Sequence, residues 1–340
     1  MRYVIIGAGA IGGTLGARLA QNSLDHPPLL IARGDHGAAI SRNGLTLRTP
    51  DEVATIPVDV ASGPKQVQLR LDDVLVLATK TQQAQAALLE WVDSPVFDAD
   101  GVGVGTAGET LPILIAMNGI ETERLALRLF RRVFGVCVWM PAVHLEPGEV
   151  ILRIAPTSGT FIIGRYLSDL SDDDRDLLTT VSADWTASTF NMHIVDDVMR
   201  WKNTKLLSNL GNGVQALLGP MADGRGIVNR LRGEAEAVFR RSGIDWAGAA
   251  EEVAWRGDVF AIRTVPGTPA ELGGSSWQSI ARGADTIETD YLNGEIALLA
   301  RMAGMGAPLN EAIQRLSREA VSGGAAAGSL TVVELESKLG

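Results

Sequence analysis

A glycine-rich turn lies near the start of the chain, directly after the apolar run YVII and before a stretch with helical composition. In a strand–turn–helix of this kind, the first glycine makes the tight turn and the second lets the backbone approach a pyrophosphate. The third allows the helix to pack closely on the strand. The start of the helix adds free N–H groups and the positive end of the helix dipole, both of which favour phosphate. The alternative is a glycine turn without a ligand. The residues expected to bind a dinucleotide are Gly7, Ala8, Gly9, Ala10, Ile11 and Gly12.

The first half of the chain alternates short apolar runs with helical stretches. YVIIG, LLIA and VLVLA are continuous apolar runs typical of strands buried in a parallel sheet. Further runs, ILIAM, VFGVCVWM, EVILRIA and GTFIIG, predict strands that complete the sheet. The stretch GVGVGTAGE, residues 101–109, is expected to be a loop. This βαβ alternation predicts an α/β fold with a Rossmann-type doubly wound sheet.

The pattern changes near residue 196, after which strand-like runs largely stop and long helical periods follow. We therefore expect three segments: a Rossmann-type domain at 1–195, an all-helical domain at 196–325 and a flexible tail at 326–340. Residues 264–274, TVPGTPAELGG, are rich in proline and glycine and predict a connector.

Composition excludes several classes of protein. Hydrophobic residues make up 46% of the 340 and charged residues 21%, which is too apolar for a disordered chain. The net charge of −10 argues against a nucleic-acid surface, and no run approaches the ~18 apolar residues of a membrane-spanning helix. The single cysteine, Cys137, excludes an internal disulfide and a thiolate zinc site. Four scattered histidines indicate no metal site, and none is given a role. We expect a cytoplasmic protein.

Three residues follow predicted strands at the edge where open α/β sheets bind ligands. Arg33 follows LLIA, about twenty residues past the glycine motif, where an acidic residue is typical of NAD sites and an arginine of NADP sites. Arg33 therefore favours NADP(H), although Asp35 could hold a ribose hydroxyl. Lys80 follows VLVLAT, and Asn118 follows ILIAM. From position alone, Lys80 could equally be a solvated lysine, and Asn118 could equally belong to an ordinary Asn-Gly turn.

A polar face runs along the helix predicted from Val198. Lys202, Lys205, Asn209 and Asn212 are spaced by three, four and three residues, which places them on one side of a helix. An exposed polar stripe is one explanation. However, asparagine is a poor helix former, and two asparagines beside a lysine would suit an anionic oxo substrate.

Two short segments near the C-terminus fit capping boxes. In the first, Ser275 would be the N-cap and Gln278 the third helical residue; in the second, Asp285 and Glu288 would take these positions. The pattern alone favours a capping role for both.

Taken together, these segments resemble the ketopantoate reductase (2-dehydropantoate 2-reductase) family along nearly the whole chain. The matching pieces, in order, are IIGAGAIGG, the strand ending in Lys80, MNGIE at 117–121, KLLSNLGN at 205–212, SSWQS at 275–279, ETDYLNG at 288–294 and GMGAPLNE. The resemblance implies a Rossmann domain followed by a helical domain, with the active site between them. It also implies NADPH-dependent reduction of a 2-oxo acid to a 2-hydroxy acid, the ketopantoate step of pantothenate biosynthesis.

The resemblance also implies roles for individual residues. Lys205 would be the general acid, Asn209 would bind the substrate, and Ser276 would bind its carboxylate or hydroxyl. Glu288 would lie beside the cofactor ribose and the reacting centre. Lys80 and Asn118 would contact the nicotinamide half of the cofactor. The neighbouring Asn212 and Ser275 are added as substrate-binding candidates.

The sequence leaves several points open. The family's second helix asparagine usually follows the first by four residues, a place held here by Gly213. Lys202 competes with Lys205 for the role of acid. The expected partner is a small 2-oxo acid, and dimerisation is open. The alternatives are a reductase of a different carbonyl compound and a dinucleotide-binding redox sensor without turnover.

Overall fold

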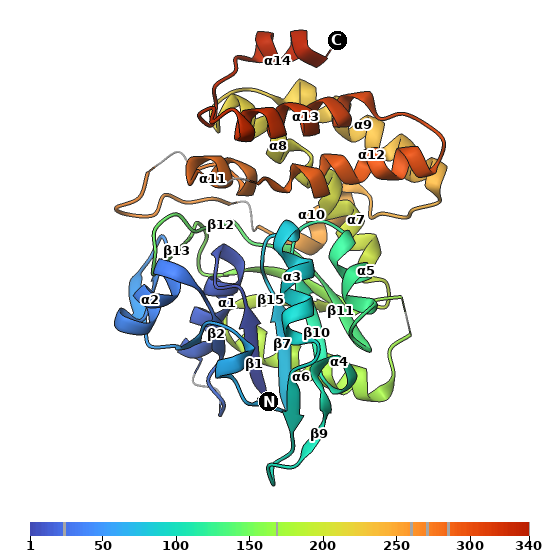
Figure 1. Cartoon of the computed structure of the whole chain (residues 1–340). Helices are drawn as coiled ribbons and strands as arrows, with labels where there is room; N and C mark the ends of the chain where they lie inside the picture. Colours follow the sequence, from blue (N-terminus) through green and yellow to red (C-terminus); the bar gives the residue numbers. More distant parts are fainter. Residues whose placement is uncertain (23–24, 168, 259–260, 270–271, 284–285, 340) are drawn as a thin grey trace. The chain divides into compact units, whose positions relative to one another are not determined.

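A central sheet of eight strands organises the first half of the chain in this computed structural model (Figure 1). The structure describes residues 1–22, 25–167, 169–258, 261–269, 272–283 and 286–339. Neighbouring strands of the central sheet are parallel, except that β11 and β14 are antiparallel. In sheet order the strands are β15 (Phe190–Ile194), β14 (Gly159–Arg165), β11 (Arg132–Trp139), β10 (Pro112–Ala116), β7 (Asp73–Leu77), β1 (Arg2–Ile6), β2 (Leu29–Ile31) and β5 (Asp59–Ala61).

Strands β7 and β10 are buried along their whole length, as a parallel sheet covered on both faces requires. The helices that connect or flank the strands are α1 (Ala10–Gln21), α2 (Gly34–Asn43), η1 (Pro64–Gln66), α3 (Thr81–Trp91), α5 (Glu121–Leu127) and α6 (Asp172–Ala187). All the apolar runs assigned to the central sheet form strands in it, apart from EVILRIA. The predicted Rossmann-type α/β class is confirmed.

The run EVILRIA forms a strand, but not in the central sheet. It becomes β13 (Glu149–Leu152), which pairs in parallel with β3 and antiparallel to β12. The four strands of this second sheet are β12 (Ala142–Val143), β13, β3 (Leu45–Arg48) and β4 (Val53–Ile56). An apolar run predicts burial in a sheet, whereas long-range pairing decides which sheet it joins.

The expected loop at 101–109 is wrong. Residues Gly103–Thr106 form β9, which pairs antiparallel with β8 (Pro95–Phe97) beside β6 (Leu69–Arg70). The Asp98 side chain closes the hairpin by accepting hydrogen bonds from the N–H groups of Asp100 and Val102, at 3.0 and 2.9 Å. Thr106 and Glu109 then form a capping box for α4 (Ala107–Thr110). These local side-chain bonds outweigh the low strand propensity of glycine.

The second half is helical. Leucines and isoleucines from α8, α9, α12, α13 and α14 meet in one buried cluster, and α12 and α13 run side by side (Figure 1). The helices are α7 (Val198–Asn209), α8 (Gly211–Leu218), α9 (Arg225–Ser242), α10 (Ala249–Arg256), α11 (Ser275–Ala281), η2 (Glu288–Tyr291), α12 (Asn293–Met302), α13 (Pro308–Ser322) and α14 (Val332–Leu339).

The chain forms two compact units. The first comprises Met1–Met117, Thr122–Met199 and Val253–Thr268, and the second comprises Asn118–Glu121, Arg200–Glu252 and Pro269–Gly340. The chain therefore passes from the first unit to the second between Met199 and Arg200, a few residues after the boundary expected at 195/196. Residues 253–268 return to the first unit, where Arg256 O accepts a hydrogen bond from the Thr160 hydroxyl at 2.9 Å.

The end of the chain is more ordered than the flexible tail expected at 326–340. Residues Val332–Leu339 form helix α14, and Leu335 is completely buried in the core of the second unit. Small residues, SGGAAAGS, precede this helix, but the apolar residues that follow them pack into the core and hold the helix in place.

Candidate functional site

The glycine motif forms the turn between β1 and α1, with Gly9 as the N-cap of the helix. Gly7 has φ of +101°, a conformation that other residues rarely adopt. A Cβ on Gly12 would lie 2.0 Å from the carbonyl oxygen of Gly7, so the helix can pack here only if the residue is glycine. In contrast, a Cβ on Gly9 would meet nothing within 4 Å. The loop is therefore open at the position where the motif lets a phosphate approach.

His36 contacts this loop through the backbone of Ala8. No role was predicted for this histidine from the sequence. Its Nε2 lies 2.7 Å from the carbonyl oxygen of Ala8, and its Nδ1 lies 2.8 Å from the amide nitrogen of Gly148. Because the amide donates to Nδ1, Nε2 carries the proton and donates to Ala8, which defines a neutral imidazole. The ring packs on His144 with centroids 4.2 Å apart. Sequence spacing gave no signal for this contact, since Gly148 is far away along the chain.

Arg33 follows β2 and is the N-cap residue of α2. Its Nε–H donates to the carbonyl oxygen of Ser62 at 2.9 Å, and its guanidinium forms an ion pair with Glu90 near the end of α3. The Arg33 side chain is 62% exposed. An anion can therefore reach Arg33, but a carboxylate already contacts it.

Lys80 is the N-cap residue of α3 and is half-buried. The strand before it, β7, ends beside β10, and the hydroxyl of Thr79 contacts the Met117 sulfur at 4.0 Å. The first unit therefore brings the ends of these two strands together at one edge of the sheet, as the sequence predicts.

The predicted polar face of the second unit crosses a break between two helices. Helix α7 ends at Asn209 and α8 begins at Gly211. Lys205 is half-buried, Asn209 is buried, and Lys202 is only 2% exposed. The alternative of an exposed polar stripe is therefore wrong for Lys202 and Asn209.

Asn118 and Asn209 meet in the second unit, although they are 91 positions apart in the sequence. The Asn209 side-chain amide donates to Oδ1 of Asn118 at 3.0 Å. One of these residues was predicted to contact the cofactor and the other the substrate. The hydrogen bond brings the two side-chain amides together within the second unit.

The break between the helices after Asn209 affects the direction of the residues at positions 212 and 213, one of which corresponds to the family's second asparagine. Gly213 is buried, and a Cβ there would lie 2.7 Å from Ile313 Cγ2 and 3.0 Å from Thr289 Cγ2. A side chain at 213 would therefore enter the core. The amide of Asn212 instead points to helix α11, where it donates to Ser275 Oγ at 3.5 Å.

The predicted capping box at Ser275 does not form. Gly274 is the N-cap of α11 and Ser275 is its first residue, while the Gln278 amide donates to Gly273 O at 3.1 Å. Gly274 is held by α8, because its N–H donates to Oε1 of Gln215 at 2.6 Å. In the second segment, Ile287 is the N-cap and Glu288 opens η2. Asp285 lies outside the described residues.

Two further residues of the predicted site, Ser276 and Glu288, are buried in this segment of the second unit. Ser276 is completely buried, and within the described part of the chain its hydroxyl has no hydrogen-bond partner. Glu288 is 2% exposed. Burial lowers the pKa of Arg282, and the negative charge of Glu288 opposes this shift. An unpaired buried hydroxyl costs stability, so its retention is typical of a group that meets a ligand or a water.

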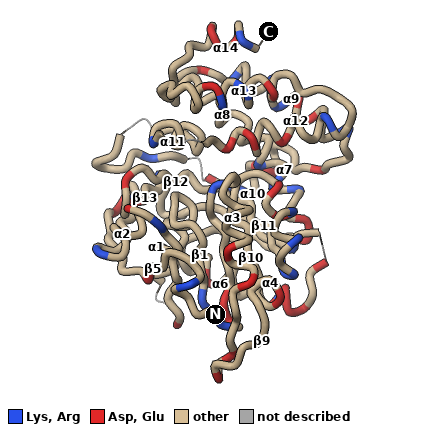
Figure 2. Tube along the Cα trace, viewed as in Figure 1, with Lys and Arg blue, Asp and Glu red and all other residues tan. Residues whose placement is uncertain are grey.

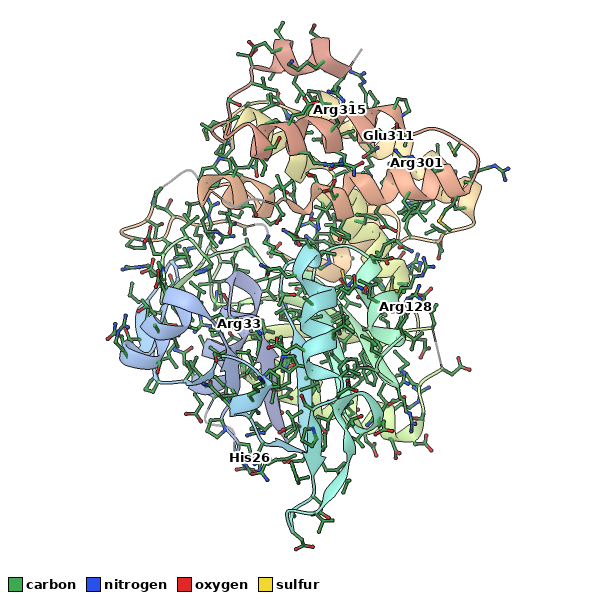
Figure 3. The ribbon with its side chains drawn as sticks, viewed as in Figure 1. His26, Arg33, Arg128, Arg301, Glu311 and Arg315 are labelled. Carbon is green, nitrogen blue, oxygen red and sulfur yellow. The ribbon has the colours of Figure 1, made fainter. Side chains whose placement is uncertain are left out.

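Acidic and basic residues are interspersed along α12 and α13, and pairs such as Arg301–Glu311, at 3.1 Å, neutralise one another (Figures 2 and 3). Among the described residues there is no cluster of three potential metal ligands. Within those same ranges, no helix has the length and apolar character needed to cross a membrane.

The fold and the glycine motif together define a Rossmann-type α/β protein with a helical second unit. Residues 3–167 match the family described as Ketopantoate reductase PanE/ApbA, and residues 197–321 match Ketopantoate reductase PanE/ApbA C terminal. The chain belongs to the ketopantoate reductase family.

Relatives similar in sequence agree with this assignment, and the solved structures below share the fold. A 2-dehydropantoate 2-reductase of Pyrococcus horikoshii is 27% identical over 95% of this chain and 99% of its own length. One from Mesorhizobium japonicum is also 27% identical, over 94% and 97%. Among solved structures, a family ketopantoate reductase from Ralstonia eutropha JMP134 has a TM-score of 0.75 at 24% identity and covers 95% of this chain and 99% of its own. A D-mandelate dehydrogenase with NADH and anilino(oxo)acetate has a TM-score of 0.76 at 20% identity, with the same coverage.

Proposed function

We propose that this protein is a nicotinamide-dependent oxidoreductase that reduces a 2-oxo acid, ketopantoate or a related compound, to the 2-hydroxy acid, with NADP(H) as cofactor. The observation that carries the proposal is the hydrogen bond between Asn118 and Asn209, which joins a predicted cofactor residue to a predicted substrate residue. Membership of the family and the names of the relatives support the same reaction.

The residues of the first unit fit a dinucleotide. The open side of Gly9 leaves room for a pyrophosphate at the start of α1, where unpaired N–H groups and the helix dipole favour negative charge. The residues Gly7, Ala8, Gly9, Ala10, Ile11 and Gly12 would hold the phosphates, and Arg33 would meet the ribose end. Lys80 would bind the nicotinamide half, as would Asn118 of the second unit. When bound, the cofactor supplies the hydride that reduces the keto carbon.

The residues of the second unit would supply a positive charge and a proton to the keto oxygen of the substrate. As the keto carbon gains a hydride, its oxygen becomes an alkoxide. The Lys205 ammonium would stabilise this charge and donate the proton that completes the alcohol. Asn209 and Asn212 would orient the oxo acid through their amides, and Ser275 and Ser276 would bind its carboxylate. Glu288 would position the reacting centre. We further propose that the protein acts in the cytoplasm.

A substrate screen tests the proposal. The purified protein is mixed with NADPH or NADH and each of a panel of 2-oxo acids that includes ketopantoate, and nicotinamide absorbance is followed. Rapid oxidation of NADPH with ketopantoate is the expected result. Oxidation with a bulkier 2-oxo acid alone would keep the reaction class and change the substrate. Cofactor binding without turnover on the whole panel would instead support a redox sensor and overturn the proposal.

The buried hydroxyl of Ser276 provides a test that separates binding from folding. Ser276→Ala removes a buried hydroxyl that has no partner in the described chain, so the melting temperature should stay the same or rise. If Ser276 binds the substrate carboxylate, the KM for the oxo acid should rise about ten- to hundredfold, the usual loss for a hydrogen bond to a charged group.

Ser279→Ala is the matched control on the same helix. Ser279 is also buried, but its hydroxyl donates to the carbonyl oxygen of Ser275 at 3.1 Å. We expect this variant to lose some stability and to keep its KM. A Ser276→Ala enzyme with an unchanged KM would remove Ser276 from the substrate site.

A further inference from the structure

The ion pair between Arg33 and Glu90 joins two segments of the first unit that are 57 positions apart in the sequence. Arg33 lies directly after β2, and Glu90 is the penultimate residue of α3. The pair lies over the turn after β5, where a Cβ on Gly63 would be 3.0 Å from Glu90 Oε1 and 3.7 Å from Arg33 Nη2. Glycine at 63 therefore leaves the room that the pair occupies.

The guanidinium is held from two directions. Its Nε–H donates to the Ser62 carbonyl oxygen at 2.9 Å, and its Nη2 contacts the carboxylate of Glu90. An arginine recognises a phosphate through the same planar set of N–H groups. A phosphate and the Glu90 carboxylate would therefore compete for one cation.

The position of Arg33 means that this competition would affect the choice between NADP(H) and NAD(H). In a Rossmann-type fold, the residue after the second strand meets the ribose that carries a hydroxyl in NAD(H) and a phosphate in NADP(H). The Arg33 and Glu90 side chains are 62% and 37% exposed, so a ligand can reach the pair, and an exposed pair is weak enough to open. Glu90 opposes the phosphate in two ways, by engaging Arg33 and by its own negative charge.

We propose that Glu90 is a specificity-determining residue that weakens NADP(H) binding relative to NAD(H) by competing with the 2′-phosphate for Arg33. This inference rests on the proposed function, because it assumes that a nicotinamide dinucleotide binds at the glycine motif. A phosphate carries close to two negative charges, and NAD(H) carries none at this position. Removing the Glu90 charge should therefore strengthen NADPH binding by about tenfold and leave NADH binding almost unchanged.

The test is a set of fluorescence titrations that give the Kd for NADPH and for NADH in each variant. Glu90→Gln removes the charge and keeps the size of the side chain. Asp93→Asn is the matched control, since it changes the net charge equally and lies three residues further on, exposed and outside the pair. The double variant Arg33→Ala/Glu90→Gln, compared with Arg33→Ala, shows whether the effect acts through Arg33.

The expected result is an NADPH Kd that falls about tenfold in Glu90→Gln, with no such change in Asp93→Asn and a much smaller change in the Arg33→Ala background. An unchanged ratio of the two Kd values in Glu90→Gln, or weaker NADPH binding, would overturn the inference while the proposed function stands. A wild-type protein that binds neither cofactor would instead overturn the proposed function, so the two failures are distinguishable.

Discussion

Replacing Lys205 with alanine should lower kcat by about 10²–10⁴-fold while NADPH still binds, because loss of a positioned general acid typically costs this much. Lys205 is half-buried and lies one turn before Asn209, which donates to Asn118. This position beside Asn209 supports the proposal that the Lys205 ammonium donates the proton. Single-turnover kinetics with NADPH and the preferred oxo acid would measure the effect.

Lys202→Met is the control for this prediction. Lys202 is on the preceding turn and is only 2% exposed, so methionine keeps the volume of its buried stem. We expect this variant to alter stability or KM and to retain most of kcat. If Lys202→Met abolished turnover while Lys205→Ala retained it, the general acid would be Lys202, one turn earlier on the helix. The roles proposed for the other residues of this face would then be wrong as well.

The fold was largely predictable because its main signal is local. Continuous apolar runs identify buried parallel strands, and six of the seven expected runs lie in the central sheet. The failures arise where distant pairing or side-chain bonds decide the outcome. β13 joins a second sheet through β3, and the Asp98 side chain turns a glycine-rich segment into a hairpin.

The sequence predicted which residue types belong to the candidate site, but not which residues they form hydrogen bonds with. Helical spacing placed Asn209 and Asn212 on one face, yet the break at Leu210 was needed to show that Asn212, rather than Gly213, points to α11. The capping-box pattern at Ser275 was misleading because Gln215 fixes Gly274 and moves the helix start by one residue. No spacing rule connects Gln215 to Gly274.

Contacts from distant segments also changed the meaning of predicted residues. Arg33 alone favours a phosphate, but Glu90 already binds it, and this partner comes from a different helix. His36 supports Ala8 of the glycine motif through a hydrogen bond that only the folded chain creates. In each case the sequence identifies the chemical group, and the tertiary structure determines what that group faces.

The glycines of the motif should separate folding from binding when each is replaced by alanine. In Gly12→Ala the new Cβ would lie 2.0 Å from Gly7 O and 3.0 Å from Ala78 Cβ and Ile5 Cγ2. Because the closest of these atoms is backbone, the helix and the turn must move apart, and overpacking of this kind costs about 1–3 kcal/mol or more. We expect a clear fall in melting temperature, with loss of cofactor binding as a consequence.

Gly9→Ala should behave in the opposite way. Its φ of −70° suits alanine, and the new methyl group meets no protein atom within 4 Å, so the melting temperature should stay close to that of the wild type. The methyl group would instead occupy the space through which a pyrophosphate approaches the backbone. Loss of one charge-assisted hydrogen bond there corresponds to about ten- to hundredfold weaker NADPH binding. Thermal melts and NADPH titrations on both variants decide the matter. A stable Gly9→Ala protein with normal NADPH affinity would show that the phosphates bind elsewhere, since no packing change could compensate for a methyl group placed in their path.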